Sequence, residues 1–118
     1  MITNFEEITQ ELTADEMVLC RQIVLGLRTK TKDNPIKSDE IVNKMNQANP
    51  KNKLTGARLR KIINYIRSNG ILPVIATSNG YYTSNDKSEI QKQILSLYQR
   101  ARSIETCADG LKKFIETN

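Results

Sequence analysis

The sequence predicts a mainly α-helical protein with a small β-hairpin, followed by a long C-terminal helix. Three observations among its 118 residues indicate this fold class. An apolar stripe with helical spacing ends at Gly70, and a β-branched run with the turn signal Asn79-Gly80 follows it at once. Apolar residues then recur in heptads over residues 90–115. The length fits one small domain with one projecting element.

The first long stretch of helical pattern starts near the N-terminus. Thr13 and Glu16 match a capping box, in which each side chain accepts a hydrogen bond from the backbone amide of the other residue. The helix that they open is expected to run to about residue 28. Gly26 in its interior indicates close contact with another helix, because glycine is otherwise unfavourable there. Amphipathic turns that pack on the domain are predicted for residues 2–11.

A short strand and a second helix are expected next. Ile36 is expected to pair with the hairpin, and Ser38 is a favourable N-cap for a helix that ends before Pro50. Residues 49–53 then form a turn of about five residues, longer than the tightest turns of three to four between paired helices.

The best-marked element is the helix after Thr55. Thr55 is a favourable N-cap because its hydroxyl can accept a hydrogen bond from a first-turn amide, and Gly70 supplies the positive φ at which many helices end. The stripe that faces the core has i, i+3, i+4, i+7 spacing and consists of Leu59, Ile62, Ile63 and Ile66.

A β-hairpin is predicted directly after this helix. Residues 71–77 are apolar and β-branched apart from Pro73, which suits an edge strand. Asn79-Gly80 indicates a type I′ turn, and residues 81–83 form the return strand. A short helix, a longer helix and a hairpin in this order are the signature of a winged helix-turn-helix.

The sequence divides into a winged helix-turn-helix domain over residues 1–83 and a C-terminal helix over residues 84–118, for dimerisation or packing. The helix carries an unbroken heptad seam made of Ile90, Ile94, Leu97, Ala101, Ile104, Ala108, Leu111 and Ile115. The seam either packs on the helix over residues 13–28 of its own chain or forms a homodimeric coiled coil. Dimerisation is favoured, because a core of about 70 residues does not need a helix of ~45 Å.

Charge is unevenly distributed along the chain, whose net charge is +5. Residues 28–70 carry eleven basic and three acidic side chains, a net charge of +8, whereas residues 1–27 carry one basic and five acidic ones. A segregated basic region is the electrostatic footprint of a phosphate-backbone partner. The charge pattern therefore predicts a nucleic-acid partner, which for a winged helix-turn-helix is double-stranded DNA. The alternatives are another acidic partner, or lysines that serve only as ordinary surface residues.

The candidate DNA-binding residues lie on the exposed face of the helix after Thr55 and at the hairpin tip. Lys61 and Asn64 are placed to reach base edges, and the arginines of this helix are placed to contact phosphates. The full set is Lys53, Thr55, Ala57, Arg58, Arg60, Lys61, Asn64, Arg67, Ser78 and Asn79.

A resemblance to a known family is carried by the run over residues 54–70, by Pro73, by the sequence Ser-Asn-Gly-Tyr-Tyr over residues 78–82, and by a long helix with Ser-Ile-Glu at 103–105. In these features the chain resembles small winged helix-turn-helix proteins of bacterial phages and mobile elements. The resemblance covers roughly residues 36–115. It implies this fold, a phage or mobile-element setting and DNA binding, and hence a regulator of transcription.

Catalysis is not expected. The chain has no histidine, no Gly-rich phosphate loop and no paired carboxylates in an apolar context, so no acid/base or metal constellation can be assembled and no cofactor is expected. Cys20 and Cys107 have no metal or redox spacing and are interpreted as small core residues in a reducing cytoplasm. Without a signal-peptide pattern or an apolar run of ~20 residues, a soluble protein without a membrane partner is expected.

An alternative function comes from the interaction class. A small basic protein of this kind could bind a host nucleoprotein, for example as an inhibitor of a defence nuclease in the manner of an anti-CRISPR protein. The acidic N-terminal segment would then be the contact surface, through Glu6, Glu7, Glu11, Asp15 and Glu16.

Overall fold

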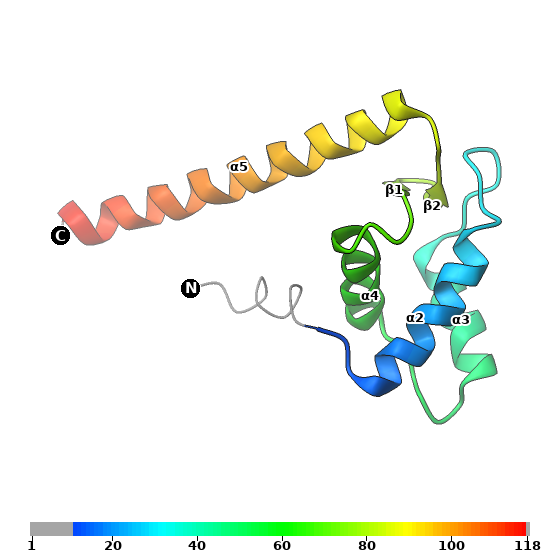
Figure 1. The fold of residues 1–118 in the computed structure, drawn as a ribbon. Helices are drawn as coiled ribbons and strands as arrows, with labels where there is room; N and C mark the ends of the chain where they lie inside the picture. The colour runs from blue at the N-terminus through cyan, green and yellow to red at the C-terminus, as the bar shows by residue number, and fades with distance from the viewer. Residues whose placement is uncertain (1–10, 118) are drawn as a thin grey trace. The chain divides into compact units, whose positions relative to one another are not determined.

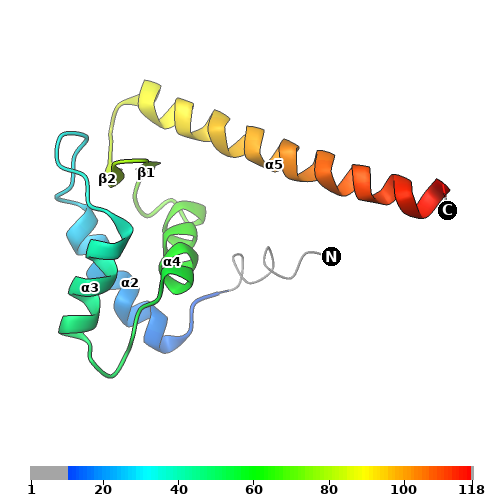
Figure 2. The same cartoon turned by 180° about the vertical axis from the view of Figure 1, so that it is seen from behind.

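The computed structural model describes residues 11–117, which form four helices and one two-stranded antiparallel sheet (Figure 1). The chain divides into two compact units, Met1–Asn85 and Asp86–Asn118, whereas the sequence prediction divided it after residue 83. Within the first unit, α2, α3 and α4 gather around one core with the hairpin at one end, as the view from behind also shows (Figure 2). The amphipathic turns predicted for residues 2–11 fall almost wholly outside the described residues.

Helix α2 (Ala14–Leu27) begins with the predicted capping box. The Thr13 hydroxyl accepts a hydrogen bond from the Glu16 amide at 3.2 Å, and the Glu16 carboxylate accepts one from the Thr13 amide at 3.0 Å. One face of the helix is buried in the core through Leu19, Cys20, Ile23 and Leu27. The interpretation of Gly26 as a close helix contact is wrong, because a Cβ built on Gly26 has no atom within 4 Å.

The open space around Gly26 predicts that a larger residue is tolerated at this position. Gly26→Ala should raise the free energy of unfolding by about 0.5–1 kcal/mol, because alanine loses less conformational entropy than glycine in a helix and meets no neighbour here. Chemical denaturation followed by circular dichroism measures it. A loss of stability would mean that another group occupies this surface.

Helix α3 (Ser38–Ala48) includes Ser38, the residue that was predicted to cap it from outside. Lys37 is the N-cap, with extended backbone angles, and Ser38 is already helical and makes no capping hydrogen bond. The predicted capping by Ser38 is therefore wrong. The first turn is stabilised instead by the negative charges of Asp39 and Glu40 near the positive end of the helix dipole.

The turn between α3 and α4 is held by Asn46. Its side chain accepts a hydrogen bond from the Leu54 amide at 2.6 Å and donates one to the Leu54 carbonyl at 3.1 Å. These two bonds define where the chain re-enters the core, because Leu54 is only 2 % exposed. The long turn over residues 49–53 is thus a defined structure that orients α4.

Helix α4 (Gly56–Ser68) confirms the sequence prediction at both ends. The Thr55 hydroxyl caps it by accepting from the Arg58 amide at 3.2 Å, and Gly70 has a φ of 62° just beyond its last turn. The predicted apolar stripe is the centre of the core, with exposed fractions between 0 and 2 % for Leu59, Ile62, Ile63 and Ile66.

Strands β1 (Val74–Thr77) and β2 (Gly80–Thr83) form the predicted hairpin, with Thr77 opposite Gly80. The predicted type I′ turn is wrong. The two central residues are Ser78 and Asn79, and neither has the positive φ that this turn requires. Gly80 has a φ of 126° and begins the return strand instead.

The expected pairing of Ile36 with the hairpin is confirmed. Ile36 and Tyr81 exchange two backbone hydrogen bonds, of 2.9 and 2.8 Å, in an antiparallel bridge. This bridge brings the Ile36 backbone so close to β2 that a Cβ on Gly80 would lie 2.5 Å from the Ile36 carbonyl oxygen. Gly80 is therefore required by close packing as well as by its backbone angle.

Helix α5 (Lys87–Thr117) is the second unit and runs unbroken for 31 residues, as predicted. Asp86 caps it, since its side chain accepts from the Ser88 amide at 2.9 Å. No described residue of α5 is buried, and the exposed fractions of the seam residues reach 81 % at Ile115. Cys107 is exposed as well, so its interpretation as a core residue is wrong, whereas Cys20 is buried as expected.

Candidate nucleic-acid interface

Glu16 is the centre of the charged contacts between α2 and α4. Although it is charged, it is only 5 % exposed. Its Oε1 lies 2.7 Å from Lys61 Nζ, and its Oε2 lies 3.4 Å from Arg58 Nε. The same carboxylate also accepts the capping-box hydrogen bond from Thr13. A single buried carboxylate therefore serves both the start of α2 and the docking of α2 against α4.

These contacts change the acidity of Glu16. Burial on its own raises the pKa of this carboxyl group, because it disfavours the charged form. The hydrogen bonds from Lys61, the Thr13 amide and Arg58, with the positive charge of Lys61, outweigh burial and lower the pKa from 4.5 to about 2. Glu16 is therefore ionised at neutral pH and balances part of the charge of the two cations.

The position of Lys61 differs from the one that its sequence pattern indicated. Its side chain is only 18 % exposed and is held by Glu16, so it does not project freely from the outer face of α4. Arg58 is 30 % exposed and also donates to the Lys53 carbonyl and to Asn52 Oδ1. Both cations brace the N-terminal half of α4 against α2 and the preceding turn.

Arg67 has a structural contact as well. Its Nε donates a hydrogen bond to the Val74 carbonyl at 3.1 Å, which ties the end of α4 to the start of β1. Asn64 is half-buried on the outer side of the same helix. Helix α4 carries four basic side chains, all of them predicted to contact DNA, and of these only Arg60 is exposed.

The other predicted site residues are exposed in two places. Around the N-terminus of α4 lie Lys53, Thr55, Ala57 and Arg60, and at the hairpin tip lie Ser78 and Asn79. The tip is ordered by Thr77, whose hydroxyl accepts from the Asn79 amide at 3.2 Å and donates to the Gly80 carbonyl at 3.3 Å. No ion pair joins Lys53 or Arg60 to any other residue of the described chain.

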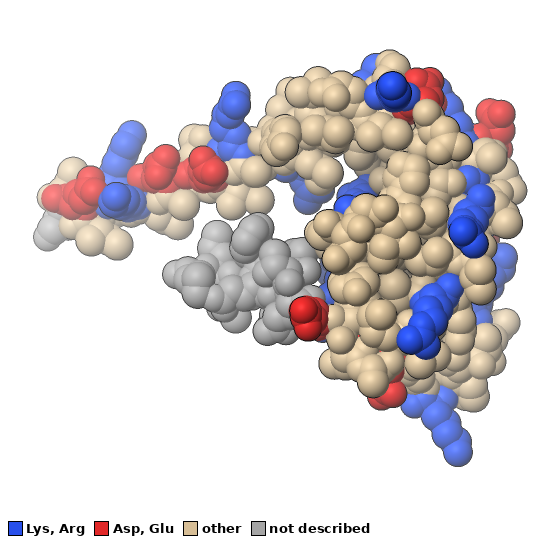
Figure 3. All heavy atoms as spheres, in the orientation of Figure 1, with Lys and Arg blue, Asp and Glu red and all other residues tan. Residues whose placement is uncertain are grey.

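A groove of about 230 Å³ lies between the start of α3 and the hairpin. It is lined on the α3 side by Lys37, Ser38 and the carboxylate-bearing Asp39, and on the hairpin side by residues that include Thr77 and Ser78. Sequence reasoning did not select Lys37, although its place in the basic segment, directly before a helix, could have indicated it. Figure 3 shows further Lys and Arg side chains, in blue, over the part of the surface formed by α2 and α3.

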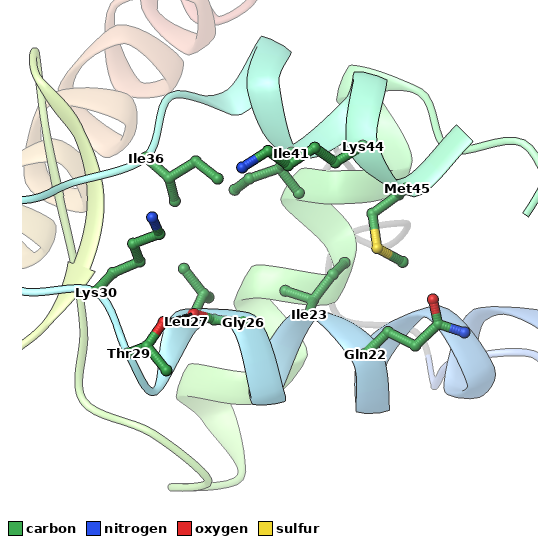
Figure 4. Close-up of a pocket in the computed structure, with 10 residues that line it drawn as sticks. All are labelled: Gln22, Ile23, Gly26, Leu27, Thr29, Lys30, Ile36, Ile41, Lys44 and Met45. Atoms are coloured by element: carbon green, nitrogen blue, oxygen red, sulfur yellow. Dashed lines mark hydrogen bonds between the residues drawn. The ribbon is translucent and has the colours of Figure 1, made fainter. Parts of the chain in front are cut away.

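A second hollow of about 280 Å³ lies between α2 and α3 (Figure 4). Its floor is made of core residues that include Ile23, Leu27 and Ile41, and two ammonium groups stand at its edge, those of Lys30 and Lys44. Specific small-molecule sites have several convergent polar groups, and Gln22 here is instead engaged with Asn49. We therefore treat the hollow as an imperfectly filled helix contact.

Comparison with protein-family models, with curated proteins and with solved structures finds no match for this chain. Within residues 11–117, no group of His, Cys, Asp and Glu side chains is arranged to hold a metal ion. Over the same residues, no helix combines the length and the apolar character needed to cross a membrane. The geometry and charge of the first unit are therefore the basis for a functional proposal.

Proposed function

We propose that this chain binds double-stranded DNA, and that its first unit acts as a winged helix-turn-helix. In this proposal α4 is the recognition helix and the hairpin is the wing. The order of α3, α4 and the hairpin supports it, as does the bridge between Ile36 and Tyr81, which adds the short third strand of such a domain. The resemblance to phage and mobile-element proteins suggests regulation of transcription as the role.

The observation that carries the proposal is the basic charge left exposed after Glu16 has engaged two cations. Lys37, Lys53 and Arg60 are exposed and form no ion pair within the described chain. Lys37 directly precedes α3, Lys53 lies in the turn before α4, and Arg60 lies in the second turn of α4. The first turn of α4 carries no acidic residue, so its positive end also favours phosphate oxygens. Contacts from lysines and helix N-termini to the phosphates fix the position of a duplex, but they do not distinguish one base sequence from another.

The Glu16 contacts alter which residues are proposed to contact DNA. Arg60, Asn64 and Ala57 form the outer face of α4, and among the described residues the Arg60 side chain has no hydrogen bond or ion pair to a neighbour, unlike the other long cations of α4. Lys61 and Arg58 contribute mainly by orienting that face. We further propose that two copies of the chain associate through α5, whose apolar seam is exposed.

Arg60→Gln should reduce the affinity for a short random duplex several-fold and lower the slope of log affinity against log salt by about 1. The reason is the loss of one phosphate contact and its released counterion. Fluorescence anisotropy between about 50 and about 200 mM salt measures both quantities.

The matched control is Lys92→Gln, which removes one charge from an exposed position of α5. It should leave both affinity and slope unchanged. Equal losses in the two variants would indicate attraction by net charge alone. Absence of duplex binding at about 50 mM salt would contradict the proposed function and favour the interaction with a host nucleoprotein.

A further inference from the structure

We infer that α5 pairs with α5 of a second copy in antiparallel orientation, in the register that sets Ala101 against the partner's Ile104. The inference rests on the dimer proposed above and adds its orientation and register. Of the eleven large apolar side chains that are exposed in the described chain, eight lie on α5. Such a concentration of apolar surface marks an interaction site.

The seam has a size pattern as well as a heptad pattern. Six of its eight positions are isoleucine or leucine, and the two small ones are Ala101 and Ala108. The two alanines are not placed symmetrically about the centre of the seam, which lies between Ala101 and Ile104. This off-centre placement distinguishes the two orientations, because each orientation brings different residues opposite the alanines.

In the antiparallel register, every seam position faces another seam position. Ile90 faces the partner's Ile115, and Ile94 faces the partner's Leu111. Leu97 faces the partner's Ala108, and Ala101 faces the partner's Ile104. Each alanine therefore meets a large side chain, and large and small residues alternate across the contact as close packing requires. The four layers that pair an alanine with a large residue are consecutive, so the two helices can approach uniformly over the middle of the contact.

In the parallel orientation, each residue faces its own copy. Ala101 would face alanine and Ala108 would face alanine, with a layer of two Ile104 side chains between them. The isoleucine and leucine layers on either side would hold the helices apart, so the two alanine layers would leave voids. Well-packed protein interiors contain few such voids.

The flanking charges weigh less than the packing. In the parallel orientation Arg100 could pair with the partner's Glu105, but such exposed ion pairs contribute little and are screened by salt. In the antiparallel register Arg100 lies beside the partner's Cys107, and Glu105 lies beside the partner's Tyr98. No two like charges face each other in that register.

Disulfide trapping in the full chain tests the orientation. In a Cys107→Ser background, the variants Leu97→Cys and Ala108→Cys are equilibrated in a glutathione buffer, separately and as a mixture. The antiparallel register predicts a covalent dimer in the mixture and none in either variant alone, because disulfides form only between close Cβ atoms. Covalent dimers of each variant alone would overturn the orientation while preserving the dimer.

A second measurement does not depend on substitutions in the seam. Ser88→Cys, in the same background, places a spin label at an exposed position near the start of α5. The antiparallel pair separates the two labels by about 45 Å, at 1.5 Å of rise per residue, whereas a parallel pair holds them within about 20 Å. A monomeric mass by light scattering at micromolar concentration would overturn both the dimer and its orientation, whatever the outcome of the DNA titration.

Discussion

Glu16→Gln should lower the free energy of unfolding at neutral pH by about 2–3 kcal/mol. Glutamine keeps an oxygen for the capping-box bond from Thr13, so the substitution removes mainly the charge that Lys61 and Arg58 surround. The cost is large because Glu16 is buried and its two cations lose their partner. Both cations keep some contact with solvent, which places the loss below that of a fully enclosed ion pair.

The same contact makes stability depend on pH. The pKa of Glu16 is about 2 in the folded protein and near 4.5 when the contact is absent. The unfolded chain therefore takes up a proton first, and the contribution of Glu16 is complete above about pH 5 and is lost as the pH falls towards 2. Glu16→Gln should remove this part of the acid dependence.

Urea denaturation at a series of pH values measures both effects. Glu40→Gln is the matched control, since it makes the same substitution at an exposed position of α3 that has no ion pair with any described residue. Its effect should stay within about 0.5 kcal/mol. If the two variants had the same stability at neutral pH, Glu16 would not be a buried partner of Lys61.

Gly80→Ala should destabilise the first unit by about 3 kcal/mol. Its φ of 126° is unfavourable for any residue with a side chain, and its added Cβ would meet three backbone atoms of Ile36 and Lys37 at 2.5 to 3.0 Å. Backbone atoms cannot move aside as a flexible side chain can. Either the hydrogen bonds between Ile36 and Tyr81 break or the hairpin shifts.

Gly70→Ala provides the control. Gly70 also has a positive φ, of 62°, but a Cβ built there has no atom within 4 Å. It should therefore cost only the backbone strain, about 1–2 kcal/mol. Thermal unfolding followed by circular dichroism compares the two variants directly. Equal losses would show that the close approach of Ile36 to β2 contributes nothing.

The sequence predicted those features whose causes are local. The capping box at Thr13, the apolar stripe of α4 and the positive φ at Gly70 depend on spacings of a few residues, and each is confirmed. The strand pairing of Ile36 was also anticipated from the order of the elements. The long unbroken α5 followed from a pattern that repeats over several heptads.

The features that were missed depend on contacts between distant segments. Glu16 was recognised as a capping residue, but its second role needs Lys61, 45 positions away, to be brought beside it by the packing of α2 on α4. Lys61 looked outward on a helical projection because that projection contains no neighbouring helix. The turn at the hairpin was misplaced by one residue because the position of Gly80 is set by Ile36, which a local turn signal does not include.

The bridge between Ile36 and Tyr81 divides the hairpin into an anchored base and a short tip. The base cannot change length without losing the bridge, because Gly80 and Tyr81 both contact Ile36. The tip, Ser78 and Asn79, contributes nothing to the core. Insertions at the tip therefore leave the folding of the unit almost unaffected, and variation in tip length is open to evolution as a means of changing the reach of the hairpin.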